Sequence, residues 1–235
     1  MTHYPSVTST NDLAMQLARD GALGGALICA DVQTAGRGRR GAVWIAPAET
    51  SVLCSWLVRV SPSLPASQWA ILTGVAVAEA LDALGYATKI KWPNDVLVDE
   101  RKVAGILVET HGDAVVIGVG VNCSVPEEAF PPELRARAGS LHTLADRDIR
   151  REDVLVAVAH QLATVYAEVT DGHLLGVLYR WNQHNWYARR DVRVSGPFGV
   201  VEGDGLFLEG RRLMWHVFKD AGVISMPLNS TVEAR

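Results

Sequence analysis

Apolar residues recur along the chain with two different periods, and these periods predict its elements. Apolar positions three and four residues apart are typical of amphipathic helices, and short apolar runs are typical of buried strands. Helices are predicted over Asp12–Gly21, Gln68–Leu84 and Arg151–Val169, and strands over Ala26–Thr34, Ser51–Val60 and Ala114–Cys123. Ser9-Thr10-Asn11 precedes the first helix as a cap, and Gly21 and Gly85 are stop signals.

The stretch Lys89–Thr110 predicts a hairpin with an interruption. Alternating apolar residues flank the turn Asp99-Glu100-Arg101, whereas Trp92-Pro93-Asn94-Asp95 breaks the first strand. Proline removes a ladder hydrogen-bond donor and keeps the residue before it extended. Asn94 and Asp95 therefore lie at a strand break, where side chains can turn toward a ligand.

From about Asn182 the pattern changes to short β-like pieces separated by glycine, without a convincing helical spacing. The pieces are Asp191–Gly196, Gly199–Gly203, Gly205–Gly210 and Gly222–Met226. Such pieces are typical of a small barrel. The chain is therefore predicted to comprise a larger domain, residues 1–185, and a small C-terminal β-barrel, residues 186–235.

Composition narrows the class of protein. The 235 residues carry a formal net charge of −4, with 49% hydrophobic residues, which fits a globular protein and argues against a general nucleic-acid binder. No apolar stretch is long enough for a transmembrane helix, and the N-terminus lacks the features of a signal peptide. Cys29, Cys54 and Cys123 form no CxxC pair, and the seven histidines show no ligand spacing. We therefore expect a cytoplasmic protein with buried free thiols and no structural metal site.

Candidate chemistry is densest in the loop Gln33–Trp44, QTAGRGRRGAVW, which joins two predicted strands. Glycines let a backbone approach a ligand closely, and arginines match carboxylate or phosphate. The loop holds three of each, Gly36, Gly38, Gly41, Arg37, Arg39 and Arg40, and it closes on Trp44. These residue types predict a loop that holds a small anion with an aromatic part.

Further polar residues could join this loop at one site. Lys102 enters a buried strand, where an ammonium group is costly unless it is used. Gly118 and Gly120 alternate in the strand that ends at Asn122, and strand glycines mark close approach of a ligand or of another backbone. Asn94 and Asn122 can pair with the edge of adenine. Because no Walker sequence, GxSxG elbow or CxxC motif is present, we expect electrostatic catalysis of a nucleotidyl transfer rather than covalent enzyme chemistry.

These motifs indicate a family. The chain resembles the biotin protein ligases, or biotin–[acetyl-CoA-carboxylase] ligases, through STN at 9–11, QTAGRGRRGAVW at 33–44, KWPNDVLVDERKVAGILVE at 91–109, GVGVN at 118–122 and SL at 140–141. The resemblance implies an α+β fold: a mixed β-sheet flanked by helices, like a class II synthetase catalytic domain, with a small C-terminal SH3-like β-barrel. It also implies two steps. Biotin and Mg-ATP give biotinyl-5′-AMP and pyrophosphate, and a carrier lysine then takes the biotinyl group and releases AMP.

The resemblance also implies roles for single residues. Biotin is expected to contact Ser9, Thr10, Asn11, Gln33, Gly36, Arg37, Gly38, Arg39, Lys102, Gly105 and Gly118, and ATP to contact Arg37, Arg39, Arg40, Trp44, Asn94, Lys102 and Asn122. Lys102, Arg39 and Arg37 are the expected catalytic residues, because cations offset the repulsion between the two reacting anions. Asp95 positions either Mg²⁺ or Lys102. The arginine loop is expected to order when ligand binds, because it has little apolar anchoring.

The implied partners are biotin, ATP with Mg²⁺, and a biotin carboxyl carrier protein, without nucleic acid or membrane. Because the first helix starts close to Met1, we expect a monofunctional ligase without the N-terminal DNA-binding domain that some members carry. The tail matches the family weakly, and Pro227 stands near the place of an arginine that reaches ATP in some members. Ala114–Cys123 could form an exposed sheet edge, which leaves monomer and homodimer both open.

Three alternatives stand beside this interpretation. A lipoate or octanoate ligase of the same fold is disfavoured, because a polar pocket for a ureido ring would be wasted on an alkyl chain. A nucleic-acid-binding module would show strongly salt-dependent affinity, and the net charge of −4 disfavours it. A catalytically inactive biotin-binding protein is disfavoured by the presence of Arg39 and Lys102.

Overall fold

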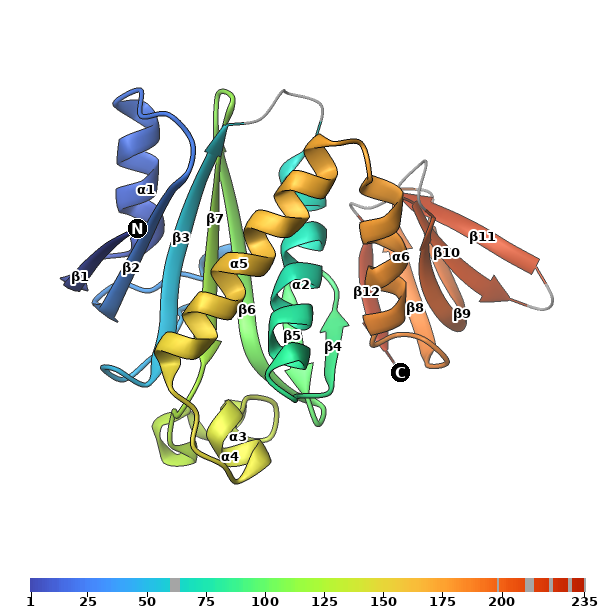
Figure 1. The fold of residues 1–235 in the computed structure, drawn as a ribbon. Coiled ribbons are helices and arrows are strands. Elements are labelled where there is room, and N and C mark those ends of the chain that lie inside the picture. Colours follow the sequence, from blue (N-terminus) through green and yellow to red (C-terminus); the bar gives the residue numbers. More distant parts are fainter. Residues whose placement is uncertain (60–63, 198, 210–213, 220–221, 228–229, 235) are drawn as a thin grey trace.

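The computed structural model describes residues 1–59, 64–197, 199–209, 214–219, 222–227 and 230–234. Within these ranges the chain forms two β-sheets and several helices (Figure 1). The helices are α1 (Thr10–Arg19), α2 (Ala66–Ala83), α3 (Pro132–Arg135), α4 (Leu141–Ala145), α5 (Arg151–Thr170) and α6 (Leu174–His184), with 3₁₀ turns η1 (Arg39–Gly41) and η2 (Glu127–Ala129). None of these helices combines the length and apolar character needed to cross a membrane.

The larger sheet has seven strands in the order β1-β2-β3-β7-β6-β5-β4. These strands are β1 (Thr2–Val7), β2 (Ala26–Gln33), β3 (Ser51–Arg59), β4 (Thr88–Lys91), β5 (Asp95–Val98), β6 (Arg101–His111) and β7 (Ala114–Asn122). β1 runs parallel to β2, and the other neighbouring strands are antiparallel. The sheet is therefore mixed, as predicted.

The second sheet is antiparallel, with the strand order β11-β10-β9-β8-β12. Its strands are β8 (Asp191–Gly196), β9 (Gly199–Glu209), β10 (Met214–Lys219), β11 (Gly222–Pro227) and β12 (Thr231–Ala234). Together with the larger sheet and its helices, it confirms the predicted α+β class with a small C-terminal β unit. The boundary at residue 185 stays a prediction.

Different helices cover the two faces of the larger sheet. On one face α2 and α5 pack over the strands, and α6 lies between α2 and the second sheet (Figure 1). α2 buries residues on all its sides because it lies between the strands and other helices. On the other face the short side chains of Ala14 and Ala18 let α1 pack closely against Ile28, Leu57 and Val116. Beyond the start of α1, this second face holds a cavity.

Five expectations about the elements are corrected by the structure. The strand break expected at Trp92–Asp95 is not an interruption within one strand but the turn between the antiparallel strands β4 and β5, where Lys91 pairs with Asp95. The β-like region does not begin near Asn182, because α6 continues to His184 and buries its apolar side. The pieces on either side of Asp204 belong to one strand, β9. β1 was not expected as a strand. Finally, β7 is no sheet edge, because it pairs with β3 and β6 along its length, and the edges are β1 and β4. Val60 and Gly210, the ends of two predicted strands, lie outside the described residues.

The segment after α6 joins the second sheet to the strand break. The buried Tyr187 hydroxyl donates to the Trp92 carbonyl at 3.1 Å, directly before the cis Trp92–Pro93 bond. The Trp186 indole N–H donates to Glu100 Oε2 at 2.7 Å, and Arg190 pairs with the same carboxylate at 2.6 Å. The break that carries Asn94 and Asp95 is thus supported from the C-terminal side of the chain.

Candidate active site

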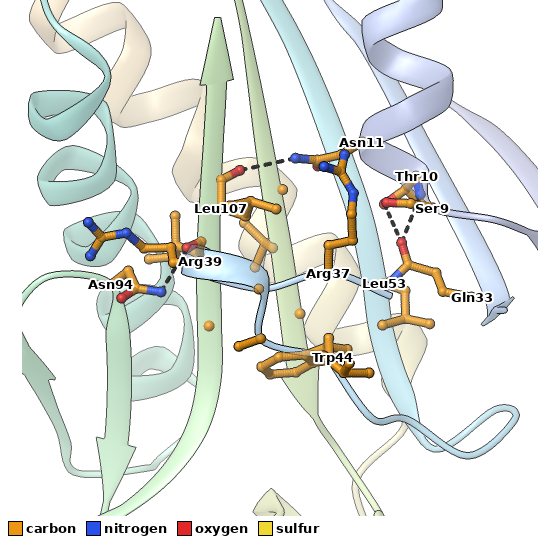
Figure 2. Close-up of a pocket in the computed structure, with 18 of the residues that line it drawn as sticks. Ser9, Thr10, Asn11, Gln33, Arg37, Arg39, Trp44, Leu53, Asn94 and Leu107 are labelled. Carbon is orange, nitrogen blue, oxygen red and sulfur yellow. Dashed lines mark hydrogen bonds between the residues drawn. The ribbon is translucent and has the colours of Figure 1, made fainter. Parts of the chain in front are cut away.

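A cavity of about 240 Å³ lies where the start of α1, the Gln33–Trp44 loop and strands β3, β5, β6 and β7 meet (Figure 2). Most residues predicted for the site line it: Ser9, Thr10, Asn11, Gln33, Arg37, Gly38, Arg39, Trp44, Asn94, Asp95, Lys102, Gly105 and Gly118. The other lining residues were not predicted as site residues: Ala42, Val43, Leu53, Cys54, Ile106, Leu107, Val119 and Gly120. Ala42 and Val43 belong to the predicted loop, and Gly120 was predicted to mark a close approach. The others lie in predicted strands, where burial in the core and lining of a cavity give the same apolar pattern.

The start of α1 supplies a polar end to this cavity. The Gln33 side-chain carbonyl accepts hydrogen bonds from the Thr10 backbone N–H at 2.7 Å and from the Thr10 hydroxyl at 3.0 Å. The fully buried Ser55 hydroxyl of β3 lies 2.7 Å from Thr10 Oγ1 and 2.6 Å from Asn11 Oδ1. Sequence reasoning missed Ser55, which holds two predicted residues in place. The expected cap is corrected as well: Thr10 and Asn11 lie within α1, and Ser9 at the N-cap position makes no side-chain capping hydrogen bond.

The Gln33–Trp44 loop folds back on itself as a short hairpin. The Gly36 carbonyl accepts from the Trp44 N–H at 3.0 Å, and the Ala42 carbonyl accepts from the Gly38 N–H at 2.7 Å. At its tip Arg40 and Gly41 have left-handed φ angles of 55° and 79°. The glycines also have GxGxxG spacing, but a strand follows the loop instead of the helix of a dinucleotide-binding turn. Ordering of the loop by ligand stays a prediction.

Two strand glycines make room for the Trp44 side chain. A Cβ atom on Gly120 would lie 2.6 Å from carbons of the indole ring, and one on Gly105 would lie 2.7 Å from it. Gly118 accommodates the Asn11 side chain in the same way. The strand glycines do mark a close approach, but a side chain makes it, whereas a ligand or another backbone was expected.

The strand break brings Asp95 and Lys102 together. Lys102 Nζ lies 2.7 Å from Asp95 Oδ1, and both side chains are about one third exposed, at 32% and 28%. The ammonium is also 5.5 Å from the centre of the Trp44 ring. The Asn94 side chain donates from Nδ2 to the Ile106 carbonyl at 3.0 Å. The Asn94 backbone carbonyl accepts from the Ile106 N–H. Of the two roles open for Asp95, the geometry favours positioning Lys102.

The two arginines on the cavity have different surroundings. Arg37 pairs with Asp12 at 2.6 Å and with Glu109 at 3.0 Å. Arg39 lies at ion-pair distance from no carboxylate among the described residues, and Figure 2 shows it directed toward Asn94. Burial, and then the neighbouring Arg40, lower the pKa of Arg39, while Asp95 opposes that shift. Of the two arginines that line the first cavity, Arg39 is therefore the one available for an anion.

A second cavity of about 590 Å³ adjoins the first and shares Arg39, Asn94 and Ile106 with it. It extends to Arg40, to Ser67 in the first turn of α2 and to the Ser230–Val232 segment of the second sheet. Arg40, predicted to contact ATP, thus lines this cavity instead of the first. A molecule that fills both cavities would pass Arg39 midway.

Asn122 and Gly36 are the predicted site residues that line neither cavity. The buried Asn122 donates from Nδ2 to the Gly139 carbonyl at 3.0 Å, and its Oδ1 has no partner among the described residues. Gly139 and Arg137 in turn hydrogen-bond the Lys102 backbone, at 3.0 and 2.7 Å. Asn122 thus supports the segment that fixes Lys102, and its contact with adenine stays a prediction. Gly36 lies at the base of the loop, where a Cβ would meet the Trp44 carbonyl at 2.6 Å.

The thiols and carboxylates limit the chemistry of the site. Cys29, Cys54 and Cys123 are free and buried, as predicted. Burial raises the pKa of Cys29 and of Cys123 to about 11 and also raises that of Cys54, so none is an activated nucleophile. In the described part of the chain, His, Cys, Asp and Glu side chains do not gather in threes as metal ligands. Asp95 is the one carboxylate among the described residues that line either cavity.

Comparison with known proteins gives consistent matches. The sequence pattern of the Biotin/lipoate A/B protein ligase family matches residues 4–122. Bifunctional ligase/repressor BirA of Bacillus subtilis is 37% identical over 99% of this chain and 71% of its own length. Biotin–[acetyl-CoA-carboxylase] ligase of Paracoccus denitrificans is 42% identical over 85% of either chain. The solved biotin protein ligase from Aquifex aeolicus in complex with biotin and ATP superposes with a TM-score of 0.87 at 24% identity, covering 99% of this chain and 98% of that one.

Proposed function

The chain belongs to the Biotin/lipoate A/B protein ligase family, and from this premise we propose that it is an ATP-dependent biotin–[acetyl-CoA-carboxylase] ligase. The observation that carries the proposal is the first cavity, which joins a buried polar end to apolar walls and then to cationic groups. Biotin has the same sequence of properties: a ureido ring, an apolar thioether ring and chain, and a carboxylate.

The polar end favours biotin over lipoate or octanoate. The buried Thr10, Asn11 and Ser55 form a hydrogen-bonded group there with the partly buried Gln33. A ureido ring offers both donors and acceptors to such groups, whereas an alkyl chain or dithiolane ring would bury them without new partners. Leu53, Leu107 and Val119 provide the apolar walls for the rest of the ligand.

The cationic groups suit the first step. The biotin carboxylate oxygen forms a bond to the α-phosphorus of ATP, and the bond from that phosphorus to the bridging oxygen of pyrophosphate breaks. Both reactants are anions, so Lys102 and Arg39 lower the cost of bringing them together and stabilise the charge that builds on the phosphoryl oxygens. Asp95 keeps the Lys102 ammonium in place at 2.7 Å. Arg37 stays assigned to the same region, but two carboxylates already hold it.

The nucleotide is proposed to extend from the first cavity into the second. Trp44 and Asn94 would hold the adenine end together with Asn122, and Arg40 and the first turn of α2 would face the polyphosphate. Mg²⁺ fits this arrangement as an ion bound mainly by phosphate and water, with Asp95 as the one carboxylate among the described residues that line the first cavity. It would neutralise phosphate charge. In the second step the amine of a lysine on a biotin carboxyl carrier protein attacks the anhydride carbonyl, and AMP leaves.

The test is mass spectrometry of the purified protein after incubation with Mg-ATP and either biotin or lipoate, without a carrier. Biotinyl-AMP together with pyrophosphate is the expected result. Lipoyl-AMP alone would assign the chain to the other branch of the family. If neither forms, the catalytic proposal is wrong, and salt-dependent binding of DNA or RNA is the next measurement.

A further inference from the structure

The Arg37 guanidinium is held by two carboxylates of the protein itself. It makes a two-pronged contact with Glu109 of β6, with Nη1 to Oε1 and Nη2 to Oε2 both at 3.0 Å. Nη2 also donates to Oδ1 of Asp12, in the first turn of α1, at 2.6 Å. Asn11 donates to the same Glu109 Oε2 at 2.8 Å. One network thus joins α1, the arginine loop and β6, which are far apart in the sequence.

Figure 2 shows that the two loop arginines point in different directions. Arg37 is directed toward Asn11 at the start of α1, and Arg39 is directed away from it toward Asn94. Arg39 contributes to both cavities, whereas Arg37 contributes to the first alone. The same residue type therefore has two tasks: Arg39 faces the ligand space, and Arg37 fastens the loop to the body of the protein.

We infer that Asp12 and Glu109 are positioning residues, which act through Arg37 to hold the Gln33–Trp44 loop over the cavity and so set how long biotinyl-adenylate is retained. We name Asp12, Arg37 and Glu109 the Arg37 strap. The inference rests on the proposed function for its consequence, retention of adenylate. Its structural part, the closed loop, does not depend on that function.

The geometry explains why the strap works as a unit. The planar guanidinium matches a carboxylate with two parallel bonds, which gives direction as well as attraction. Asp12 and Arg37 are 46% and 42% exposed, so each pair alone would contribute little. Two carboxylates converge on one cation, however, and they would repel each other if Arg37 moved away. Lifting the loop therefore breaks three hydrogen bonds and leaves two like charges unshielded.

The negative charge of Asp12 and Glu109, taken alone, predicts the opposite effect on adenylate retention from the strap, so the two explanations can be told apart. Asp12 and Glu109 carry negative charge near a site for anions. If they acted only through that charge, then neutralising either one would tighten the binding of adenylate. If they act through the strap, the same substitution loosens the loop and shortens retention.

The test uses Asp12→Asn and Glu109→Gln in the full chain, with Asp20→Asn as the matched control. Asp20 caps the far end of α1, and its substitution removes the same charge from the same helix. Protein that carries labelled biotinyl-adenylate is mixed with excess unlabelled biotin and Mg-ATP. The release of the labelled adenylate from the protein is then timed at several salt concentrations. We expect release about three- to tenfold faster in the two strap variants, with the melting temperature and kcat for adenylate formation close to wild type. Wild-type release should accelerate with salt, and this salt dependence should weaken in the variants.

Hydrogen exchange of the ligand-free protein gives a readout that needs no activity. The Gly38 and Trp44 amides form hydrogen bonds within the loop hairpin. Their exchange rates should therefore rise in both strap variants and stay at the wild-type value in Asp20→Asn. Unchanged exchange of these amides in both variants overturns the strap, whether or not the protein makes adenylate. Faster exchange with unchanged or slower release of adenylate overturns its proposed role in retention. Failure of wild-type protein to form adenylate counts against the proposed function alone.

Discussion

Replacing Lys102 by alanine removes the ammonium group proposed to meet both the biotin carboxylate and the α-phosphate. Loss of one positioned donor from a site of developing negative charge typically lowers the rate by about 10²–10³-fold, or about 3–4 kcal/mol. Here the loss also leaves the Asp95 carboxylate, now 2.7 Å from Nζ, without its cation beside two anions. We therefore expect the upper end of that range, about a thousandfold slower formation of biotinyl-AMP.

The fold should survive this substitution. The Lys102 side chain is 32% exposed, and pairs of this kind contribute about 1 kcal/mol or less to stability. The Lys102 backbone is held independently, by hydrogen bonds to Arg137 and Gly139. The melting temperature of Lys102→Ala should thus lie within a few degrees of wild type, so that a loss of rate reports chemistry instead of unfolding.

The assay is a rapid-quench measurement of biotinyl-AMP from labelled ATP, made on Lys102→Ala, Asp95→Asn and the double variant. If Asp95 acts through Lys102, then Asp95→Asn slows wild-type enzyme but has little further effect once Lys102 is gone. If the losses of rate in the two single variants add up in the double variant, Asp95 instead has a separate role, such as contact with Mg²⁺. Adenylate formation by Lys102→Ala at the wild-type rate would refute the role of this residue.

Other predictions follow from single contacts. Gly120→Val should displace the Trp44 ring from β7, since a Cβ on residue 120 would lie 2.6 Å from the ring. Steady-state kinetics should then show a KM for ATP raised about tenfold or more. Gln33→Leu leaves the two Thr10 donors without their acceptor, so calorimetry should show biotin binding weakened by about 1–3 kcal/mol, with ATP binding unchanged. A thiol reagent at about pH 8 should label Cys29, Cys54 and Cys123 slowly in native protein and rapidly in denaturant, because burial raises the pKa of each. The hydrogen bond with His3, and then the contact with Arg151, lower the pKa of Asp31 below its ordinary 3.8, although burial opposes them. The Asp31 carboxylate therefore stabilises the fold above pH 3.8, and this contribution is lost as the pH falls through the lowered pKa. Melting curves of Asp31→Asn should therefore lose part of the acid dependence seen in wild type.

The elements that could be predicted carry their signals locally. The cap before α1, the proline at the strand break and the turn at Asp99-Glu100 each fix a boundary within a few residues. α6 had a local signal as well, because Leu174, Val177, Leu178 and Trp181 have helical spacing, but it is interrupted by Gly176. β1 contains Pro5, which argues against a strand. The structure accommodates it at the sheet edge, where Pro5 is skipped in the pairing with β2.

What could not be predicted depends on contacts distant in sequence. Asp12 and Glu109 have the pattern of solvated charges at the start of a helix and the end of a strand, and no local feature shows that they converge on Arg37. Ser55 likewise has the pattern of an ordinary buried strand residue. The glycines of β6 and β7 predicted a close approach but could not show that Trp44 makes it. Residue types thus indicated the chemistry, and the topology of the sheet decided which groups meet.

The charges around the first cavity support the proposal that ATP binds together with a cation of its own. Three cations there face three carboxylates: Arg37, Arg39 and Lys102 against Asp12, Glu109 and Asp95. Biotin and ATP then add several negative charges, and Arg40 at the second cavity offsets only one of them. The remaining compensation has to arrive with ATP. We propose that a Mg²⁺ ion held mostly by phosphate and water supplies it, since the described residues hold no cluster of three metal-ligating side chains. The Arg37 strap sharpens this requirement, because an arginine held by two carboxylates has little charge left to offer the ligand.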